Sequence, residues 1–333
     1  MKAFITPEYR SRLAPWILSC IDIKRKSGYL YNNEALFLKR FDCFVTSGGF
    51  DTGRLDRDVV EAWMELKETE SVNSRNYRVA AVRILGEHMH SLGQDAYVAP
   101  PLRGEPRSLM HYPSSDEIAA LFRAVDARMP KRSLRHSYAH IEVPVILRLC
   151  YCLGMRIGEC VNLRVEDVDL SLGRILITHS KGDKHRYVYP GWDMVALLEG
   201  YLGRIGELAG PSAWVFPSQG DPSRPVSRAV ASAHYRDAWK RCCKENGISY
   251  GAKNPTVHAL RHSYTVHRIN GWAEEGEELS ELLPYLSRHL GHSGIQESYH
   301  YYHLLDSVSY GVRMGINNAS RFGKEAYEYH EET

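Results

Sequence analysis

The chain has 333 residues, of which 44% are hydrophobic and 25% are charged, and its formal net charge at pH 7 is +2. These values are normal for a soluble globular protein, and the length is sufficient for two domains of ordinary size. The small net charge gives no compositional sign of a nucleic-acid binder, so any basic footprint must be local.

Neither a membrane span nor an export signal is predicted. No run of about 18 apolar residues exists, which excludes a membrane-spanning helix. The N-terminal stretch "MKAFITPEYRSRLAPWILSC" has one early lysine and no sustained apolar segment, so it does not resemble a signal peptide, and a cytoplasmic protein is expected. The seven cysteines lack the paired spacing of zinc knuckles, and most are expected to be buried thiols.

The first third of the chain is predicted to form short helices. "NEALFLKRFDCFV" is apolar at roughly helical spacing, and two further stretches align apolar residues on one face. In the first of these the aligned residues are Val59, Val60, Trp63 and Leu66. In the second, which ends at Gly93, they are Val82, Leu85, Met89 and Leu92.

A proline-rich stretch without periodicity, "AYVAPPLRGEPRSL", is the best candidate for a linker. It divides the chain into a helical domain at 1–95, a linker at 96–107 and a larger domain at 108–333. The second domain is predicted to open with a helix, because Ser114 and Glu117 have the spacing of a capping box.

The second domain is predicted to be mostly helical with a small sheet. "EVPVILRLCYCLG" and "RIGECVNLRVEDVDL" are interpreted as two more helical stretches. In "GRILITHSKGDKHRYVYP", two short β-rich runs flank the turn "SKGDKH", which predicts a β-hairpin. The rest of the chain is predicted to be helical to the end.

The stretch "HALRHSYTVH", residues 258–267, allows three interpretations. It could be a polar helix face without further role. It could be a zinc site, since His258 and His262 have the spacing of the HExxH helix, but Ala259 replaces the glutamate and no third ligand stands close by. It could be a phosphate site, because the fork of Arg261 can bind two phosphate oxygens and a neighbouring histidine can exchange a proton near neutral pH.

The phosphate interpretation needs a second arginine, a proton donor and a nucleophile, and the chain supplies candidates for each. Arg156 stands at a predicted helix start, with Glu159 three residues further on. Lys181 lies in the predicted hairpin turn. His292 precedes a tyrosine cluster at Tyr299, Tyr301 and Tyr302.

These segments together resemble the boxes of the tyrosine recombinase (phage integrase) family. The matching boxes, in the family's order, are "LGMRIGE", "SKGDK", "HALRH", "LGH" and Tyr301, nine residues after His292. The resemblance covers roughly residues 106 to 303, and the helical first third is similar to the family's core-binding domain by pattern only. The fold that it implies is mainly α with a small β-sheet: a helical, SAM-like core-binding domain and a mixed α/β catalytic domain with a C-terminal tail.

The chain departs from the family between Arg261 and His292. This segment, which contains "NGWAEEGEELSELLP", is longer than usual and acidic, and it is expected to form a surface excursion.

The resemblance implies a role for each candidate residue. Arg156 and Arg261 would neutralise the charge that gathers on the phosphate in the transition state. Tyr301 would be the nucleophile, His258 the base that takes its proton, and Lys181 the donor to the leaving 5′-oxygen. His292 would hold a phosphate oxygen or orient the tyrosine, and Glu159 would support a neighbouring residue. No metal and no cofactor would be required.

The function implied is that of a site-specific DNA recombinase or integrase of a mobile element. It would act on double-stranded recombination sites through a covalent 3′-phosphotyrosine, as a homotetramer on DNA, with directionality or accessory factors as further partners. The two domains would clamp the duplex. Two alternatives stay open: a catalytically reduced DNA-binding relative, and strand relaxation like that of a type IB topoisomerase.

Overall fold

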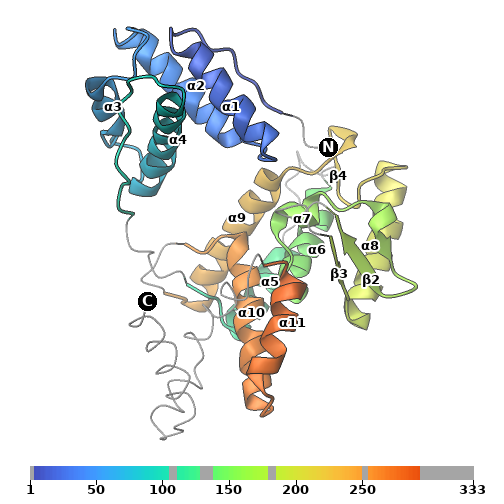
Figure 1. Cartoon of the computed structure of the whole chain (residues 1–333). Helices are drawn as coiled ribbons and strands as arrows, with labels where there is room; N and C mark the ends of the chain where they lie inside the picture. The colour runs from blue at the N-terminus through green and yellow to red at the C-terminus, as the bar shows by residue number, and fades with distance from the viewer. Residues whose placement is uncertain (1–3, 105–110, 128–137, 179–184, 250–253, 293–333) are drawn as a thin grey trace, which may run out of the picture. The chain divides into compact units, whose positions relative to one another are not determined.

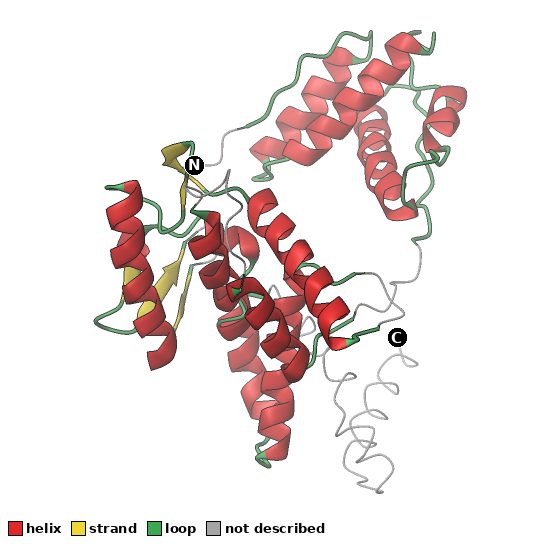
Figure 2. Ribbon diagram, turned by 180° about the vertical axis from the view of Figure 1, so that it is seen from behind, coloured by secondary structure: helices red, strands yellow, loops and turns green. Residues whose placement is uncertain are grey.

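The computed structural model describes residues 4–104, 111–127, 138–178, 185–249 and 254–292. Contacts between residues divide the chain into two compact units, Met1–Arg107 and Ser108–Thr333, which are considered one at a time (Figure 1). Helices make up most of the described residues of each unit, and the strands among them are few and short, so the predicted fold class is confirmed (Figure 2). No helix in the described part of the chain combines the length and the hydropathy that a membrane span requires.

In the described part of the first unit, four helices surround one apolar core. The helices are α1 (Ala14–Lys26), α2 (Asn32–Ser47), α3 (Arg57–Met64) and α4 (Val72–Ser91). The hydroxyl of Ser71 caps α4 by accepting a hydrogen bond from the Ser74 N–H at 3.2 Å. The helical periodicity is confirmed where it matters most, since Trp63, Leu85 and Met89 are buried in this core.

Two residues that the periodicity assigned to the core are exposed. Leu66 lies beyond the end of α3 at Met64, because the backbone turns to an extended conformation at Glu65. Leu92 is the residue after the last turn of α4, and Gly93 follows it with a φ of +75°. In both cases the apolar spacing continued past the point where the helix ends.

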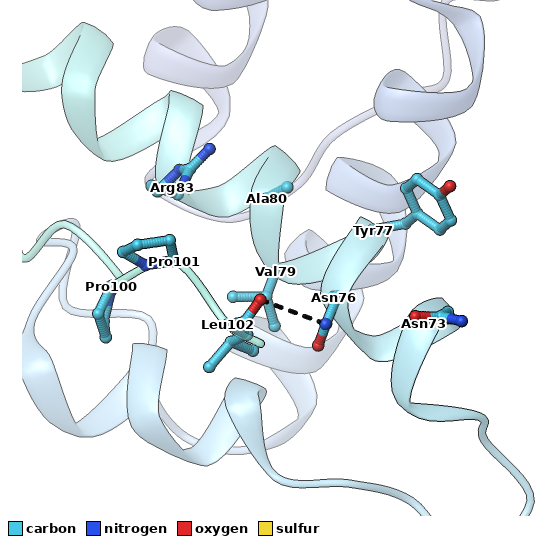
Figure 3. A pocket seen from close by; sticks show the side chains of 9 residues that line it. All are labelled: Asn73, Asn76, Tyr77, Val79, Ala80, Arg83, Pro100, Pro101 and Leu102. Carbon is cyan, nitrogen blue, oxygen red and sulfur yellow. Dashed lines mark hydrogen bonds between the residues drawn. The ribbon is translucent and has the colours of Figure 1, made fainter. Parts of the chain in front are cut away.

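The proline-rich stretch packs on the first unit over much of its length. Ala96 and Ala99 are buried in the core of that unit, and the Tyr97 N–H donates to the Leu55 carbonyl at 2.7 Å. A groove of about 260 Å³ lies between this stretch and α4 (Figure 3). Its lining residues are Asn73, Asn76, Tyr77, Val79, Ala80, Arg83, Pro100, Pro101 and Leu102.

In the second unit α6 (Ala139–Cys152) packs against α5 (Ser115–Asp126), α7 (Ile157–Val161), α8 (Trp192–Ala209), α9 (Arg228–Asn246) and α10 (Val257–Glu274). Helix α11 (Leu279–Leu290) packs against α10. The predicted capping box is present: the Glu117 N–H donates to the Ser114 hydroxyl, and the Ser114 N–H donates to the Glu117 carboxylate. Of the seven cysteines, four are buried free thiols: Cys20, Cys150, Cys160 and Cys242.

The predicted hairpin is part of a three-stranded antiparallel sheet. Its strands are β1 (Val168–Asp169), β2 (Arg174–Ile177) and β3 (Arg186–Val188), with Ile177 paired to Arg186. A second hairpin, β4 (Pro217–Ser218) and β5 (Asp221–Pro225), was not predicted. Its sequence carries two prolines in five residues of β5, and proline disfavours strands, so no β signal was present.

Two further expectations are wrong. Only Ile157–Val161 of "RIGECVNLRVEDVDL" is α-helical, because the backbone on both sides of Arg164 pairs with 213–215 and a 3₁₀ turn at Val165–Asp167 leads into β1. The acidic segment before His292 is not an excursion. It consists of the last turns of α10, a short exposed turn and the start of α11, and Ile269 and Leu283 are buried in a small core between the two helices.

Candidate active site

Arg156 is held at the N-cap of α7 by the turn that ends α6. Gly154 makes this turn with a φ of +60°, and a Cβ there would lie 2.6 Å from Cδ1 of Tyr264. The Arg156 backbone N–H donates to Oε2 of Glu159 at 2.9 Å, and its Nη1 donates to Oε1 at 3.0 Å. The guanidinium also donates to two carbonyls at the end of α11: Nη1 to Leu290 at 3.4 Å and Nη2 to Gly291 at 3.1 Å.

Arg261, on α10, also contacts the end of α11. It is buried, with an exposed fraction of 2%, since the apolar side of α10 packs into the unit. Its Nη1 donates to the Gly154 carbonyl at 2.6 Å and its Nη2 to the Leu290 carbonyl at 2.7 Å. The two arginines of the predicted phosphate site therefore meet at one carbonyl oxygen.

The C-terminal end of α11 is the feature that brings these side chains together. The last carbonyls of a helix lack partners within the helix and lie at the negative end of its dipole. Gly291 ends α11 with a φ of +65°, and the His292 N–H closes the turn by donating to the Ser287 carbonyl at 3.0 Å. The carbonyls of His289, Leu290 and Gly291 each accept a hydrogen bond from an arginine: Arg186, Arg156 or Arg261.

Glu159 is buried between two arginines. Its carboxylate accepts from Arg156, as above, and from both terminal nitrogens of Arg186, at 3.0 and 2.7 Å. Burial alone would raise the pKa of this carboxyl, but the hydrogen bonds and charge of Arg186, followed by those of Arg156, lower it to about 2. Glu159 is thus an ionised support for Arg156 in the described structure.

Arg186 was not identified from the sequence. Strand residues two apart point to the same face, so a hairpin with Val188 buried also places Arg186 inward. An arginine at an inward strand position needs a buried acceptor, and this was the signal that could have singled it out.

His258 and His262 lie at the start of α10 with ring centroids 4.3 Å apart. Loss of hydration lowers the pKa of His258, and the charges of Arg261 and Arg156 lower it further. The neutral form of the ring is therefore favoured. The ring of His262 lies against that of Tyr112, with centroids 5.7 Å apart. Among the described residues, no group of three or more His, Cys, Asp or Glu side chains could hold a metal ion.

The structure describes only one of the remaining candidates, His292. His292 follows Gly291 at the end of α11 and is half-buried. Lys181, Tyr299, Tyr301 and Tyr302 lie outside the described residues. The structure thus brings Arg156, Glu159, His258, Arg261 and His292 to one region of the second unit.

Comparison with known proteins gives one consistent result. The model of the phage integrase family matches residues 114–307. A putative integrase/recombinase of Sinorhizobium fredii, y4eF, is 30% identical over 203 residues, which is 60% of this chain and 67% of that protein. A second from the same organism, y4rE, is 28% identical over 84% of this chain and 88% of its own length.

Solved structures of low sequence identity share the fold. A lambda integrase dimer bound to a COC′ core site has a TM-score of 0.61 and 16% identity, covering 87% of this chain and 94% of that one. A XerH site-specific recombinase bound to palindromic difH substrate has a TM-score of 0.59 and 18% identity, covering 90% and 87%.

The fold and the family match define the class as a tyrosine recombinase, a site-specific recombinase enzyme. The chain belongs to the phage integrase family.

Proposed function

We propose that this enzyme cuts and rejoins double-stranded DNA at specific sites through a covalent 3′-phosphotyrosine intermediate. The observation that supports this most directly is the meeting of Arg156 and Arg261 at the Leu290 carbonyl. These residues come from separate boxes of the sequence, and a preorganised pair of guanidiniums is what a phosphoryl transfer needs.

The two arginines bind the phosphate that is attacked. Arg156 is the more accessible of the two, with 25% of its side chain exposed, whereas Arg261 is almost fully buried and supports the floor of the site. Bidentate arginine donors stabilise the charge on the non-bridging oxygens as it grows. His292, one residue beyond the Gly291 carbonyl that Arg156 binds, holds an oxygen of the same phosphate or orients the tyrosine.

The covalent step transfers two protons, one from the nucleophile and one to the leaving group. The Tyr301 oxygen attacks phosphorus and gives its proton to His258, while the bond to the 5′-oxygen breaks and Lys181 protonates that oxygen. A 5′-hydroxyl from a partner strand then attacks the phosphotyrosine and releases Tyr301. The phosphotyrosine bond conserves the energy of the phosphodiester bond. The reaction therefore uses neither ATP nor a metal ion.

The partners we propose are DNA recombination sites and three further copies of the chain. Among proteins of similar fold, XerH is bound to difH substrate and a lambda integrase tetramer is bound to a Holliday junction, which supports DNA as the partner and a tetramer as the active assembly. A directionality or accessory factor is a further candidate partner, and a mobile element a candidate host. Leu304, Leu305, Val308 and Val312 have helical spacing in the tail, and we propose that this segment passes to a neighbouring protomer.

The first unit is proposed as the core-binding DNA domain, with the groove along α4 as its contact surface. Asn73, Tyr77 and Arg83 line this groove and all come from α4 (Figure 3). Asparagine is suited to paired hydrogen bonds with an adenine edge, and arginine to binding a backbone phosphate.

The products of the reaction distinguish this proposal from two alternatives. A catalytically reduced relative would bind its site and form no covalent complex. A type IB topoisomerase-like enzyme would form the complex and relax supercoiled DNA without joining strands from two duplexes.

The test is a trapping experiment on DNA that the full-length protein has selected from a random duplex library. A nick beside the scissile phosphate lets the short 5′-fragment diffuse away, so the covalent complex accumulates on a denaturing gel. Wild type and Tyr302→Phe should trap, and Tyr301→Phe should bind the DNA without trapping. Trapping by Tyr301→Phe but not by Tyr302→Phe would place the nucleophile at Tyr302.

A further inference from the structure

Arg186 is a buried cation at the start of β3 to which no role in the reaction has been given. Its side chain is 7% exposed and lies between β3, α11 and the start of α7. Its Nε donates to the His289 carbonyl at 2.6 Å, and its two terminal nitrogens donate to the two oxygens of Glu159. One planar group therefore joins the β-hairpin to α11 and to the helix start that carries Arg156.

Each oxygen of Glu159 is shared between the two arginines. Oε1 accepts from Nη1 of Arg156 and Nη1 of Arg186, both at 3.0 Å. Oε2 accepts from the backbone N–H of Arg156 at 2.9 Å and from Nη2 of Arg186 at 2.7 Å. Because Arg186 fixes both oxygens, it sets the plane of the carboxylate to which Arg156 is bound.

Arg186 also lies directly against the end of α11. A Cβ on Gly291 would be 3.0 Å from Nη1 of Arg186, a tight contact, and the φ of +65° itself favours a glycine. The Gly291 carbonyl and the Leu290 carbonyl are in turn acceptors for Arg156. Both supports of the Arg156 guanidinium, Glu159 and the α11 end, thus depend on Arg186.

We infer that Arg186 is a positioning residue for strand cleavage: it orients Glu159 and the end of α11, and through them the phosphate-binding guanidinium of Arg156. This inference rests on the proposed function. Lysine cannot replace Arg186, because a single ammonium cannot span two carboxylate oxygens and the His289 carbonyl with fixed geometry.

The test compares Arg186→Lys with wild type in the full-length protein. The rate constant and the amplitude of covalent-complex formation are measured in a single turnover, together with DNA affinity and the thermal midpoint. The matched control is Arg174→Lys, on β2 of the same sheet, where the arginine pairs with Asp169 at 3.3 Å and has no hydrogen bond or ion pair with Arg156, Glu159 or Arg186.

Positioning predicts that Arg186→Lys lowers the rate constant roughly tenfold to a hundredfold, with amplitude and DNA affinity close to those of wild type. Arg174→Lys should match wild type. Adding Arg186→Lys to Arg156→Lys should slow cleavage by less than the product of the single effects, because both act on one guanidinium. Glu159→Gln removes the charge of the carboxylate but keeps its shape. Combined with Arg156→Lys, it should also slow cleavage by less than the product of the single effects, and this pair tests the link if Arg186→Lys does not fold.

Three results would overturn the inference. The rate constant of Arg186→Lys could equal that of wild type, its effect could multiply with that of Arg156→Lys, or only the amplitude could fall, which is the mark of a purely structural role. If wild type itself forms no covalent complex, the proposed function fails and this inference fails with it.

Discussion

Arg156 and Arg261 donate hydrogen bonds to the same atom, the carbonyl oxygen of Leu290, with N–O distances of 3.4 and 2.7 Å. The acceptor lies at the end of α11, where backbone carbonyls have no partner within the helix. The two guanidiniums are therefore held in place by contacts within the protein. Such preorganisation lowers a barrier because no reorganisation is needed as charge develops.

Arg156→Ala should lower the single-turnover cleavage rate by about 10²–10³-fold, or about 3–4 kcal/mol, by analogy with the removal of one preorganised donor. DNA affinity should fall much less, because many phosphate contacts remain. Cleavage should persist in EDTA. The control is Arg164→Ala, an arginine that stacks on Trp214 at 4.7 Å and pairs with Glu166. A cleavage step that requires a metal ion would contradict this account.

Arg261→Ala should differ from Arg156→Ala in its effect on stability. Arg261 is buried, and its removal leaves the Gly154 and Leu290 carbonyls without this donor. An unsatisfied buried acceptor costs about 1–3 kcal/mol, so the thermal midpoint should fall as well as the cleavage rate. Equal midpoints for the two variants, measured by thermal unfolding, would be inconsistent with these contacts.

The pKa of His258 should lie below 6.5 in the DNA-free protein, since lost hydration and the charges of Arg261 and Arg156 favour the neutral ring. An NMR titration, with the signal assigned through His258→Gln, measures this directly. Arg156→Gln should raise the His258 midpoint because one of the opposing charges is gone. A wild-type midpoint above 6.5 would remove the argument that His258 is ready to accept a proton at pH 7.

The boxes could be read from the sequence because each depends on local spacing. "HALRH" and "LGMRIGE" each span a few neighbouring residues, so Arg156, His258 and Arg261 could be named as candidates from spacing alone. Arg186 was missed because its partner Glu159 is distant in sequence, and only the hairpin register brings them together. Leu66 and Leu92 were wrongly assigned to the core because apolar periodicity does not show where a helix ends.

Glu142 should make the stability of the fold dependent on pH. It is 1% exposed on α6, and its Oε1 has no hydrogen-bond partner within the described residues. Burial raises its pKa from 4.5 to about 8, so the folded state favours the neutral acid. The resulting stabilisation is complete below pH 4.5 and is lost as the pH rises toward 8, at up to about 1.4 kcal/mol per pH unit.

Glu142→Gln should flatten that dependence, because the amide does not titrate. The free energy of unfolding in urea, measured between pH 5 and pH 8 in about half-unit steps, gives the two slopes. Glu199→Gln, on the exposed side of α8, serves as the control. Parallel curves for wild type and Glu142→Gln would show that Glu142 is not a buried neutral acid.

The groove along α4 should contribute both affinity and sequence preference. Arg83→Ala should weaken binding to all DNA and reduce the salt dependence by about one phosphate contact if Arg83 binds the backbone. Asn73→Ala should instead relax the preference at one base pair, at a cost of about 1–3 kcal/mol. Selection from a random library and salt titrations separate the two. Arg57→Ala, on α3 and paired with Glu61, is the control; an effect equal to that of Arg83→Ala would contradict a specific role for the groove.

The last prediction concerns the segment after His303. Leu304, Leu305, Val308 and Val312 repeat at helical spacing, and an apolar helical face needs a surface to cover it. If that surface belongs to a neighbouring protomer, a chain truncated after His303 should fold, bind its site and form the covalent complex on a single duplex. It should not assemble the tetramer on paired sites, as judged by light scattering and by the absence of recombinant product. An unfolded truncated chain would instead show that the segment completes the core of its own protomer, and the exchange of tails between protomers would be ruled out.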